Sequence, residues 1–291
     1  MSLIVDNVTK EFRIRKGLKS SKLRAVNNVS LTLEPGKTVA LVGESGSGKS
    51  TIAKMIMRLE TPTEGSITAD GISSLVRGTQ ARDYLKLVQM VYQDPFASLN
   101  PFHSIAHHIE RPLKIHGRAT SRDEVTDHVH ELLTRVNLTP PQTYAGRKPH
   151  ELSGGQRQRV VIARALAPGA KYLVADEPVS MLDVSIRLSV LNLLARLQRE
   201  DNLGVLYITH DLATARHFSD EIIVLYQGTI VEQGPSDEVI LNPQHDYTKR
   251  LLAAAPSPAN HGKLRELVRA ELAQTGSGSP LDTVERLMEE K

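Results

Sequence analysis

Two patterns of apolar residues predict strands along much of the chain. In 28-NVSLTL-33 apolar and polar residues alternate, which indicates an edge strand with one buried face. The run 39-VALVG-43 is apolar throughout, which indicates a buried central strand. Further buried strands are predicted by the apolar runs at residues 87–93, 172–176, 204–210 and 222–226. Helical patterns lie between several of these runs, so we expect an α/β fold with a mainly parallel sheet.

A different pattern occupies residues 94–150, where proline and histidine are frequent. One amphipathic helix is predicted there, 122-RDEVTDHVHELLTRV-136. We interpret this segment as a helical insertion in the α/β core. Further on, 255-APSPANHG-262 has the composition of a linker, and two short stretches with helical periodicity follow it, at residues 264–272 and 281–288.

The composition excludes several classes of protein. With 291 residues, 40% of them hydrophobic, the chain can bury a substantial core. The 36 basic residues are nearly balanced by 33 acidic ones, and aromatic residues make up only 4%, so we expect no nucleic-acid partner. The absence of Cys excludes disulfides, iron–sulfur ligation and thiolate metal sites, and fits a reducing cytoplasm.

Membrane insertion is not expected from the apolar pattern. No apolar run reaches the roughly 18 residues that a transmembrane helix needs. The N-terminal MSLIVDNVTKEF has an acidic residue where a signal peptide would be basic and then apolar. We therefore expect a soluble chain, or one held at a membrane only by a partner.

The segment 41-LVGESGSGKSTIAKM-55 predicts a phosphate-binding loop between a strand and a helix. It matches G-x-x-x-x-G-K-[ST], whose glycines let backbone N–H groups surround phosphate oxygens. Lys49 would neutralise the β and γ phosphates, and the Ser50 hydroxyl would ligate Mg²⁺. The predicted nucleotide-binding residues of this loop are Gly43, Glu44, Ser45, Gly46, Ser47, Gly48, Lys49, Ser50 and Thr51.

Paired carboxylates follow another predicted strand, in 171-KYLVADEP-178. Asp176 ends the apolar run and is placed to hold Mg²⁺ through water, as a Walker B aspartate does. Glu177 would lie just beyond the strand, near the γ-phosphate, where it could polarise a water molecule. A nucleotide with Mg²⁺ is therefore the expected ligand, while the P-loop alone does not separate kinases, GTPases, motor ATPases and transporters.

A second anion-binding turn is predicted by 152-LSGGQRQRVVIARAL-166. Its Ser-Gly-Gly sequence leads into a helix and offers a hydroxyl, open backbone amides and a helix N-terminus. With 152-LSGGQ-156 complete, the chain resembles the ATP-binding-cassette (ABC) family. The resemblance implies a P-loop NTPase with a RecA-like core, a mainly parallel sheet, an antiparallel N-terminal β portion and an inserted helical subdomain. It divides the chain into an ATPase domain over 1–252, with core 1–93 and 157–252 and helical subdomain 94–156, and a tail over 253–291.

The family resemblance also implies a head-to-tail dimer of cassettes, with ATP between the P-loop of one and the signature of the other. By motif, Phe12 would stack on adenine, Gln93 would sense the γ-phosphate and ligate the metal, and His210 would contact the γ-phosphate. With Glu177 these give the predicted catalytic residues Glu177, His210 and Gln93, and the predicted metal ligands Ser50, Gln93 and Asp176. The residues expected to reach the partner's nucleotide are Ser153, Gly154, Gly155, Gln156 and Asp183.

The loop 180-SMLD-183 is similar to the family's S-A-L-D sequence, with Met181 in the small-residue position. Ser180 and Asp183 retain the pattern, so we expect the contact across the dimer to be retained. The effect of Met181 on the local packing stays open. With all the catalytic motifs present, we expect a cassette that hydrolyses ATP.

Two local stretches resemble the peptide and nickel importer subfamily. They are 92-YQDPFASLNPFHSI-105 and 242-NPQHDYTKRLLAAAPSP-258, the latter with Asp246 for the usual Pro and Lys249 for the usual Arg. The resemblance implies a peripheral ATPase on the cytoplasmic face of a bacterial or archaeal membrane. Its expected partners are a second ATPase subunit, two membrane permease subunits and an extracytoplasmic solute-binding protein. The absence of Cys points to the cluster-free member of an ATPase pair.

Several alternatives remain open at the level of sequence. The favoured substrate is a di- or oligopeptide, but nickel chelates, oligosaccharides and opine-like solutes are imported with the same type of cassette. A soluble ATPase that uses nucleotide-driven dimerisation without transport is the alternative from another class. The identity of the partner cassette, as a copy or a paralogue, and the role of the tail also stay open.

Overall fold

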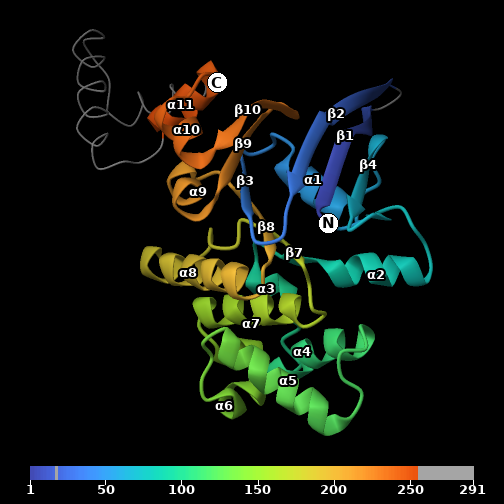
Figure 1. Cartoon of the computed structure of the whole chain (residues 1–291), viewed down its shortest axis with the longest axis vertical. Coiled ribbons are helices and arrows are strands. Elements are labelled where there is room, and N and C mark those ends of the chain that lie inside the picture. Colours follow the sequence, from blue (N-terminus) through green and yellow to red (C-terminus); the bar gives the residue numbers. More distant parts are fainter. Residues whose placement is uncertain (17–18, 255–291) are drawn as a thin grey trace.

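A six-stranded sheet forms the centre of the protein (Figure 1). The computed structural model describes residues 1–16 and 19–254. The strand order is β10-β9-β3-β8-β7-β6, in which only the β9–β10 pair is antiparallel. The five parallel strands are those that the apolar runs predict. The strands of this sheet are β3 (Thr38–Val42), β6 (Val88–Val91), β7 (Tyr172–Asp176), β8 (Gly204–Thr209), β9 (Glu221–Tyr226) and β10 (Thr229–Pro235).

A second sheet is antiparallel and has the order β2-β1-β4-β5. The predicted edge strand at 28–33 is the end of β2, at the edge of this sheet, and therefore does not join the sheet that contains β3. Strand β1 was not predicted, because register shifts between Val5 and Glu11 interrupt its alternation. The bounds are β1 (Leu3–Lys16), β2 (Lys19–Leu33), β4 (Glu64–Ala69) and β5 (Ile72–Ser73).

Helices flank the central sheet and form the inserted segment. The predicted helix at 122–136 is confirmed as α5, which begins with a capping box between Ser121 and Glu124. The helices next to the sheets are α1 (Lys49–Ile56), α2 (Thr79–Leu87), α7 (Gly154–Leu166), α8 (Val184–Glu200), α9 (Leu212–Phe218), α10 (Ser236–Leu241) and α11 (Asp246–Ala254). The insertion contains α3 (Pro95–Ser98), α4 (Ile105–Ile115), α5 (Arg122–Arg135), α6 (Pro141–Ala145) and the 3₁₀ helix η1 (Pro149–Glu151).

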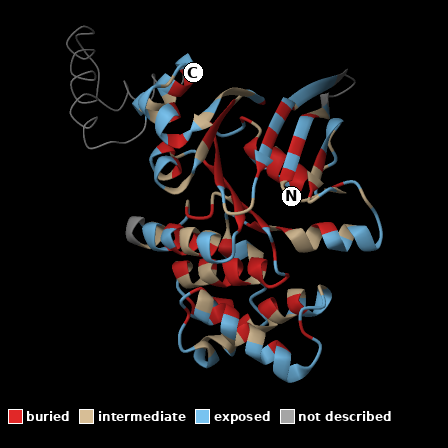
Figure 2. Cartoon of the chain, in the orientation of Figure 1, coloured by how far each residue is buried: buried red, intermediate tan, exposed pale blue. Residues whose placement is uncertain are grey.

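The central sheet separates two hydrophobic clusters. Successive residues of β3 point to opposite faces, so that Val39 and Leu41 enter one cluster while Ala40 and Val42 enter the other. The cluster that contains Ala40 and Val42 continues through α7, which is buried among α4, α5 and α8 (Figure 2). The inserted helices therefore share their core with the sheet, and the proposed boundaries of the subdomain stay a prediction.

Within residues 1–16 and 19–254, none of the helices combines the length and the apolar character needed to span a bilayer. The linker and the two stretches predicted after residue 254 lie outside the described residues.

Candidate functional site

The predicted phosphate-binding loop lies where β3 ends and α1 begins. Gly48 adopts φ +110°, and a Cβ at this position would lie 2.5 Å from the carbonyl oxygen of Ala25, so only glycine fits. Ser45 and Gly46 are exposed, whereas Ser47 is buried with a hydroxyl that has no hydrogen-bond partner among the described residues. The loop thus has exposed residues at its tip and a buried hydroxyl without a partner among the described residues, which suits a phosphate ligand.

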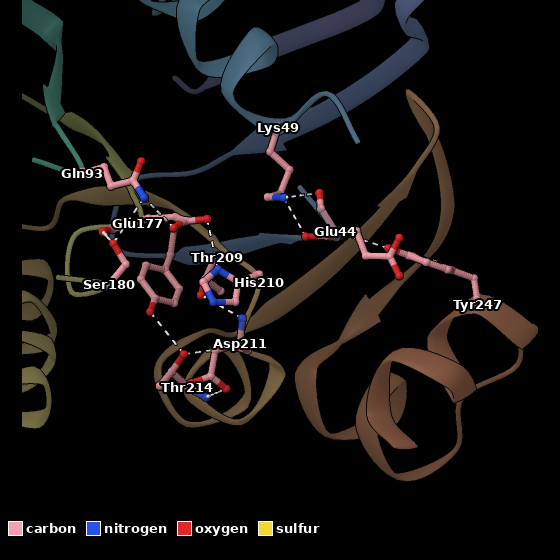
Figure 3. Close-up of polar contacts among 12 residues, drawn as sticks. Glu44, Lys49, Gln93, Glu177, Ser180, Thr209, His210, Asp211, Thr214 and Tyr247 are labelled. Atoms are coloured by element: carbon pink, nitrogen blue, oxygen red, sulfur yellow. Dashed lines mark hydrogen bonds and ion pairs between the residues drawn. The ribbon is translucent and has the colours of Figure 1, made fainter. Parts of the chain in front are cut away.

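Lys49 lies at the start of α1 with its ammonium group folded back over the loop (Figure 3). Its Nζ donates to the carbonyl oxygens of Gly43, at 2.6 Å, and Glu44, at 2.8 Å. Burial lowers the pKa of Lys49, while the carboxylates of Glu177 and Asp176 favour its charged form. The result is a desolvated cation whose hydrogen bonds within the described part of the chain go to neutral carbonyls, and phosphate oxygens would be stronger acceptors.

Asp176 ends β7 beside the start of α1. Its carboxylate accepts a hydrogen bond from the Ser50 hydroxyl, and burial raises the pKa of this carboxyl group. A hydroxyl and a carboxylate are the hard oxygen ligands that Mg²⁺ prefers, so the pair fits the predicted metal. Gln93 lines the same groove as Asp176, but its amide faces Glu177, and its role as a ligand stays a prediction.

Glu177 is held between residues from two distant segments. Gln93 Nε2 donates to Glu177 Oε2 at 2.9 Å, and His210 Nδ1 lies 3.1 Å from Glu177 Oε1 (Figure 3). Gln93 also approaches the Ser180 hydroxyl at 3.4 Å. Glu177 has φ +44°, a strained conformation for a residue other than glycine and one often found at functional sites. The structure therefore brings together the three predicted catalytic residues.

Two arginines join the segment after Gln93 to the signature helix α7. The guanidinium of Arg157 lies over the Phe96 ring, 4.1 Å from its centroid. Arg164 Nη1 donates to the carbonyl oxygen of Ser98 at 2.5 Å. Both arginines lie on α7, so α3 and α7 are connected at two points.

The signature sequence forms the N-terminal cap of α7. Ser153 Oγ accepts from the backbone N–H of Gln156 at 3.3 Å, and the Gln156 side chain accepts from the N–H of Ser153 at 3.0 Å. Helix α7 packs on α3, α4, α5, α8 and β6, whereas the P-loop lies between β3 and α1. Met181 and Asp183 are exposed beside the signature, where a partner could contact them.

The two signature glycines differ in the space around them. A Cβ on Gly155 would lie 2.5 Å from Cγ2 of Ile186, whereas one on Gly154 would lie 3.4 Å from Leu182. Because Ile186 is β-branched and stiff, we expect Gly155→Ala to lower the free energy of unfolding by about 1–3 kcal/mol. Gly154→Ala is the matched control and should leave it unchanged or slightly raised. Thermal unfolding of both variants measures this, and equal stabilities would contradict the steric argument.

Phe12 lies in β1, away from the network around Glu177. The ammonium group of Lys10 lies 4.9 Å from the centroid of its ring and forms an ion pair with Glu60 at 2.8 Å. The structure gives Phe12 a partly exposed ring with a cation near it. Its stacking on adenine stays a prediction.

One contact of the P-loop was missed by the reasoning from sequence. The backbone N–H of Glu44 donates to the hydroxyl of Tyr247 at 2.9 Å, although 203 residues separate them. Tyr247 belongs to the stretch 242–258, which was singled out for its resemblance to a subfamily and not for its chemistry. Nothing in the local pattern indicates that its hydroxyl reaches the loop.

A groove of about 840 Å³ runs between the sheet and the inserted helices. It is rich in imidazole and guanidinium groups, and Asn100 and His103 on its wall flank Phe102, which is 82% exposed. Burial lowers the pKa of His108 and of His116, so these imidazoles are neutral at neutral pH. The polar residues that line the groove include Gln93, Asp94, Asn100, His103, His107, His108, Arg111, His116, Arg164 and Asp176.

The fold and the site define a nucleotide-binding cassette of the P-loop ATPase class. The chain belongs to the ABC transporter family, whose model matches residues 26–180. It is an ATPase of this family and binds ATP.

Relatives with known names resemble most of the chain. It is 46% identical over 264 residues to the oligopeptide transport ATP-binding protein AppF of Bacillus subtilis, covering 89% of this chain and 79% of that protein. It is 44% identical over 260 residues to the di/tripeptide transport ATP-binding protein DppF of Pseudomonas aeruginosa, covering 88% and 79%. The dimeric cassette MJ0796 bound to ADP and Pi superposes with a TM-score of 0.70 and 33% identity, over 80% of this chain and 98% of that chain.

Proposed function

We propose that this chain is the ATP-hydrolysing subunit of a binding-protein-dependent importer for di- or oligopeptides. The observation that carries the catalytic part is the position of Glu177 between Gln93 and His210, next to a P-loop that holds a buried lysine. The transport part is supported by the similarity, over almost nine-tenths of the chain, to proteins named for peptide transport.

The contacts of the structure suggest an order of events. Phosphate oxygens would draw Lys49 Nζ away from the carbonyls of Gly43 and Glu44, because charged acceptors form stronger hydrogen bonds. The γ-phosphate would compete with Glu177 for Gln93 and His210. Once released, the Glu177 carboxylate could accept a proton from the attacking water. ATP binding would thus free the Glu177 carboxylate from its contacts with Gln93 and His210, so that it could act as a general base.

The metal completes this proposal. Ser50 and Asp176 would hold Mg²⁺, with Asp176 acting through water, and the ion would supply neutralisation of phosphate charge. The residues of this chain supply the remaining functions. Lys49 binds the phosphates, Glu177 takes a proton from the attacking water, and Gln93 and His210 orient the γ-phosphate. Burial raises the pKa of Asp176, and a bound cation would favour the charged form of this carboxyl group.

The proposed assembly contains two cassettes beneath two membrane subunits. The second cassette, most simply a paralogue, would complete each site with its own signature, and this chain would offer Ser153, Gly154, Gly155, Gln156 and Asp183 in return. A solute-binding protein would deliver the peptide on the other side of the membrane. The cassette would lie on the cytoplasmic face, with the groove beside Gln93 receiving a cytoplasmic segment of a membrane subunit.

Association separates this function from its alternatives. Purification from the native membrane, followed by mass spectrometry of the retained subunits and solute, should recover two polytopic membrane proteins, a second cassette and a peptide. A retained nickel chelate, oligosaccharide or opine-like solute would correct the substrate alone. A free dimer, or one that sediments with ribosomes, would instead support a soluble ATPase without transport.

The exposed Phe102 provides a specific test of the groove. We expect Phe102→Ser to reduce co-purification of the membrane subunits, because a large apolar side chain that is 82% exposed would lose its partner surface. Leu241→Ser is the matched control, since Leu241 is 59% exposed on α10, far from the inserted helices (Figure 1). Thermal unfolding checks that both variants fold. Equal recovery of the membrane subunits with both variants would exclude this docking surface.

A further inference from the structure

Helix α11 reaches the P-loop from the far end of the described chain. Its second residue, Tyr247, is 2% exposed, and the Tyr247 hydroxyl accepts the backbone N–H of Glu44 at 2.9 Å (Figure 3). The family model that matches this chain ends at residue 180, so it does not include this contact. Burial raises the pKa of Tyr247, so the group that accepts this N–H at neutral pH is a neutral phenol.

Several contacts fix Tyr247 in this place. Its ring packs on that of Tyr226, at the end of β9, with 4.2 Å between the centroids. The segment before α11 is fastened to β10, because the Glu232 carboxylate accepts the backbone N–H groups of Gln244, at 2.7 Å, and His245, at 3.1 Å. The hydroxyl is thus carried by a residue that packs on β9 and follows a segment hydrogen-bonded to β10.

The peptide group that joins Gly43 to Glu44 connects this support to the lysine of the site. Its N–H, on Glu44, donates to the Tyr247 hydroxyl, and its carbonyl oxygen, on Gly43, accepts from Lys49 Nζ at 2.6 Å. The other side of the loop is held by the turn after β9, where the N–H of Gly228 donates to the carbonyl oxygen of Ser47 at 2.9 Å. The loop is therefore braced at its beginning by α11 and further along by the β9–β10 turn.

We propose that Tyr247 is a positioning residue for nucleotide binding, which holds the first turn of the P-loop in the conformation that surrounds phosphate. The Glu44 N–H donates to this hydroxyl, so it is not free to bind phosphate. The hydrogen bond orients the loop instead. Without the hydroxyl, the N–H would lose its partner, and the Gly43 carbonyl in the same planar peptide group would lose its fixed direction toward Lys49. The proposal rests on ATP binding by the P-loop and is independent of what the importer carries.

Tyr247→Phe tests the proposal, because it removes one oxygen atom and keeps the ring packed on Tyr226. Loss of a hydrogen bond to a backbone donor should weaken ATP binding by about fivefold to tenfold and raise KM for ATP similarly. The kcat at saturating ATP should stay within about twofold, since the catalytic network around Glu177 is untouched. Tyr226→Phe is the matched control, because the Tyr226 hydroxyl accepts its hydrogen bond from Gln227 Nε2, at 3.2 Å.

Hydrogen–deuterium exchange provides a second measurement on the nucleotide-free protein. We expect faster exchange of the amides at residues 44–47 in Tyr247→Phe than in the wild type or in Tyr226→Phe. An unchanged KM for ATP or unchanged amide exchange in Tyr247→Phe would overturn the proposal. An equal loss of ATP affinity in Tyr226→Phe would also overturn it. Failure of the wild-type protein to bind ATP would instead refute the site itself, and failure to co-purify with membrane subunits would refute transport alone.

Discussion

Replacement of Glu177 by Gln should abolish most ATP turnover while ATP binding is retained. The amide keeps the size of the side chain but cannot accept a proton, and loss of a general base costs about 10²-fold to 10⁴-fold in rate. Other groups, above all Lys49, would contact the phosphates, so the dissociation constant for ATP should change little. Phosphate release at saturating ATP and equilibrium binding of labelled ATP measure the two effects separately.

The control for this variant is Glu200→Gln, the same substitution at the exposed end of α8. Glu200 forms an exposed i,i+4 ion pair with Arg196 at 3.4 Å, so turnover should match the wild type. Wild-type turnover in Glu177→Gln would refute the role of Glu177. Loss of both binding and turnover would instead assign it to holding the site together, through its contacts with Gln93 and His210.

Replacement of Lys49 by Met should weaken ATP binding by about 10-fold to 100-fold, the effect of losing a charged hydrogen bond to phosphate. Met fills a similar volume, so the helix and its packing should persist. Lys54→Met is the matched control, because Lys54 lies on the same helix but is exposed. Equal affinities of the two variants for ATP would exclude the predicted contact of Lys49.

The Lys49→Met variant should show no loss of stability. Burial lowers the pKa of Lys49 below its ordinary value of 10.5, so the folded chain holds this proton less tightly than the unfolded chain does. Keeping the ammonium group charged at neutral pH therefore costs stability, and the cost falls as the pH rises through the lowered pKa. Lys49→Met should unfold at the same or a higher temperature at neutral pH, with this advantage shrinking at alkaline pH. A clear loss of stability would show that the carbonyl contacts outweigh desolvation.

The fold was predicted best where burial is complete. The runs that became β3, β6, β7, β8 and β9 are apolar because both faces of a parallel sheet are covered by other elements. Strand β1 was missed because its bulges shift the side chains from one face to the other, and a pattern with period two cannot follow such a shift.

The local structure around the candidate site was predicted where it depends on a short stretch of sequence. The P-loop, the paired carboxylates and the capped signature turn each depend on neighbouring residues, and the structure has them as the motifs indicate. Contacts between distant segments were not predictable from spacing. Gln93 and Glu177 meet because β6 and β7 are adjacent parallel strands, and Tyr247 meets Glu44 because α11 folds back over β9 and β10.

The two arginines on α7 have a consequence for a paired cassette. Arg157 and Arg164 fasten the segment that follows Gln93 to the helix whose first turn is the signature. A shift of Gln93 toward ATP in its own site would therefore alter the turn that this chain presents to its neighbour. Thermodynamic reciprocity then requires that nucleotide bound in the neighbour's site alters the affinity of this P-loop by the same factor. The two ATP molecules of such a pair would bind cooperatively, and the sign of the cooperativity would be set on α7.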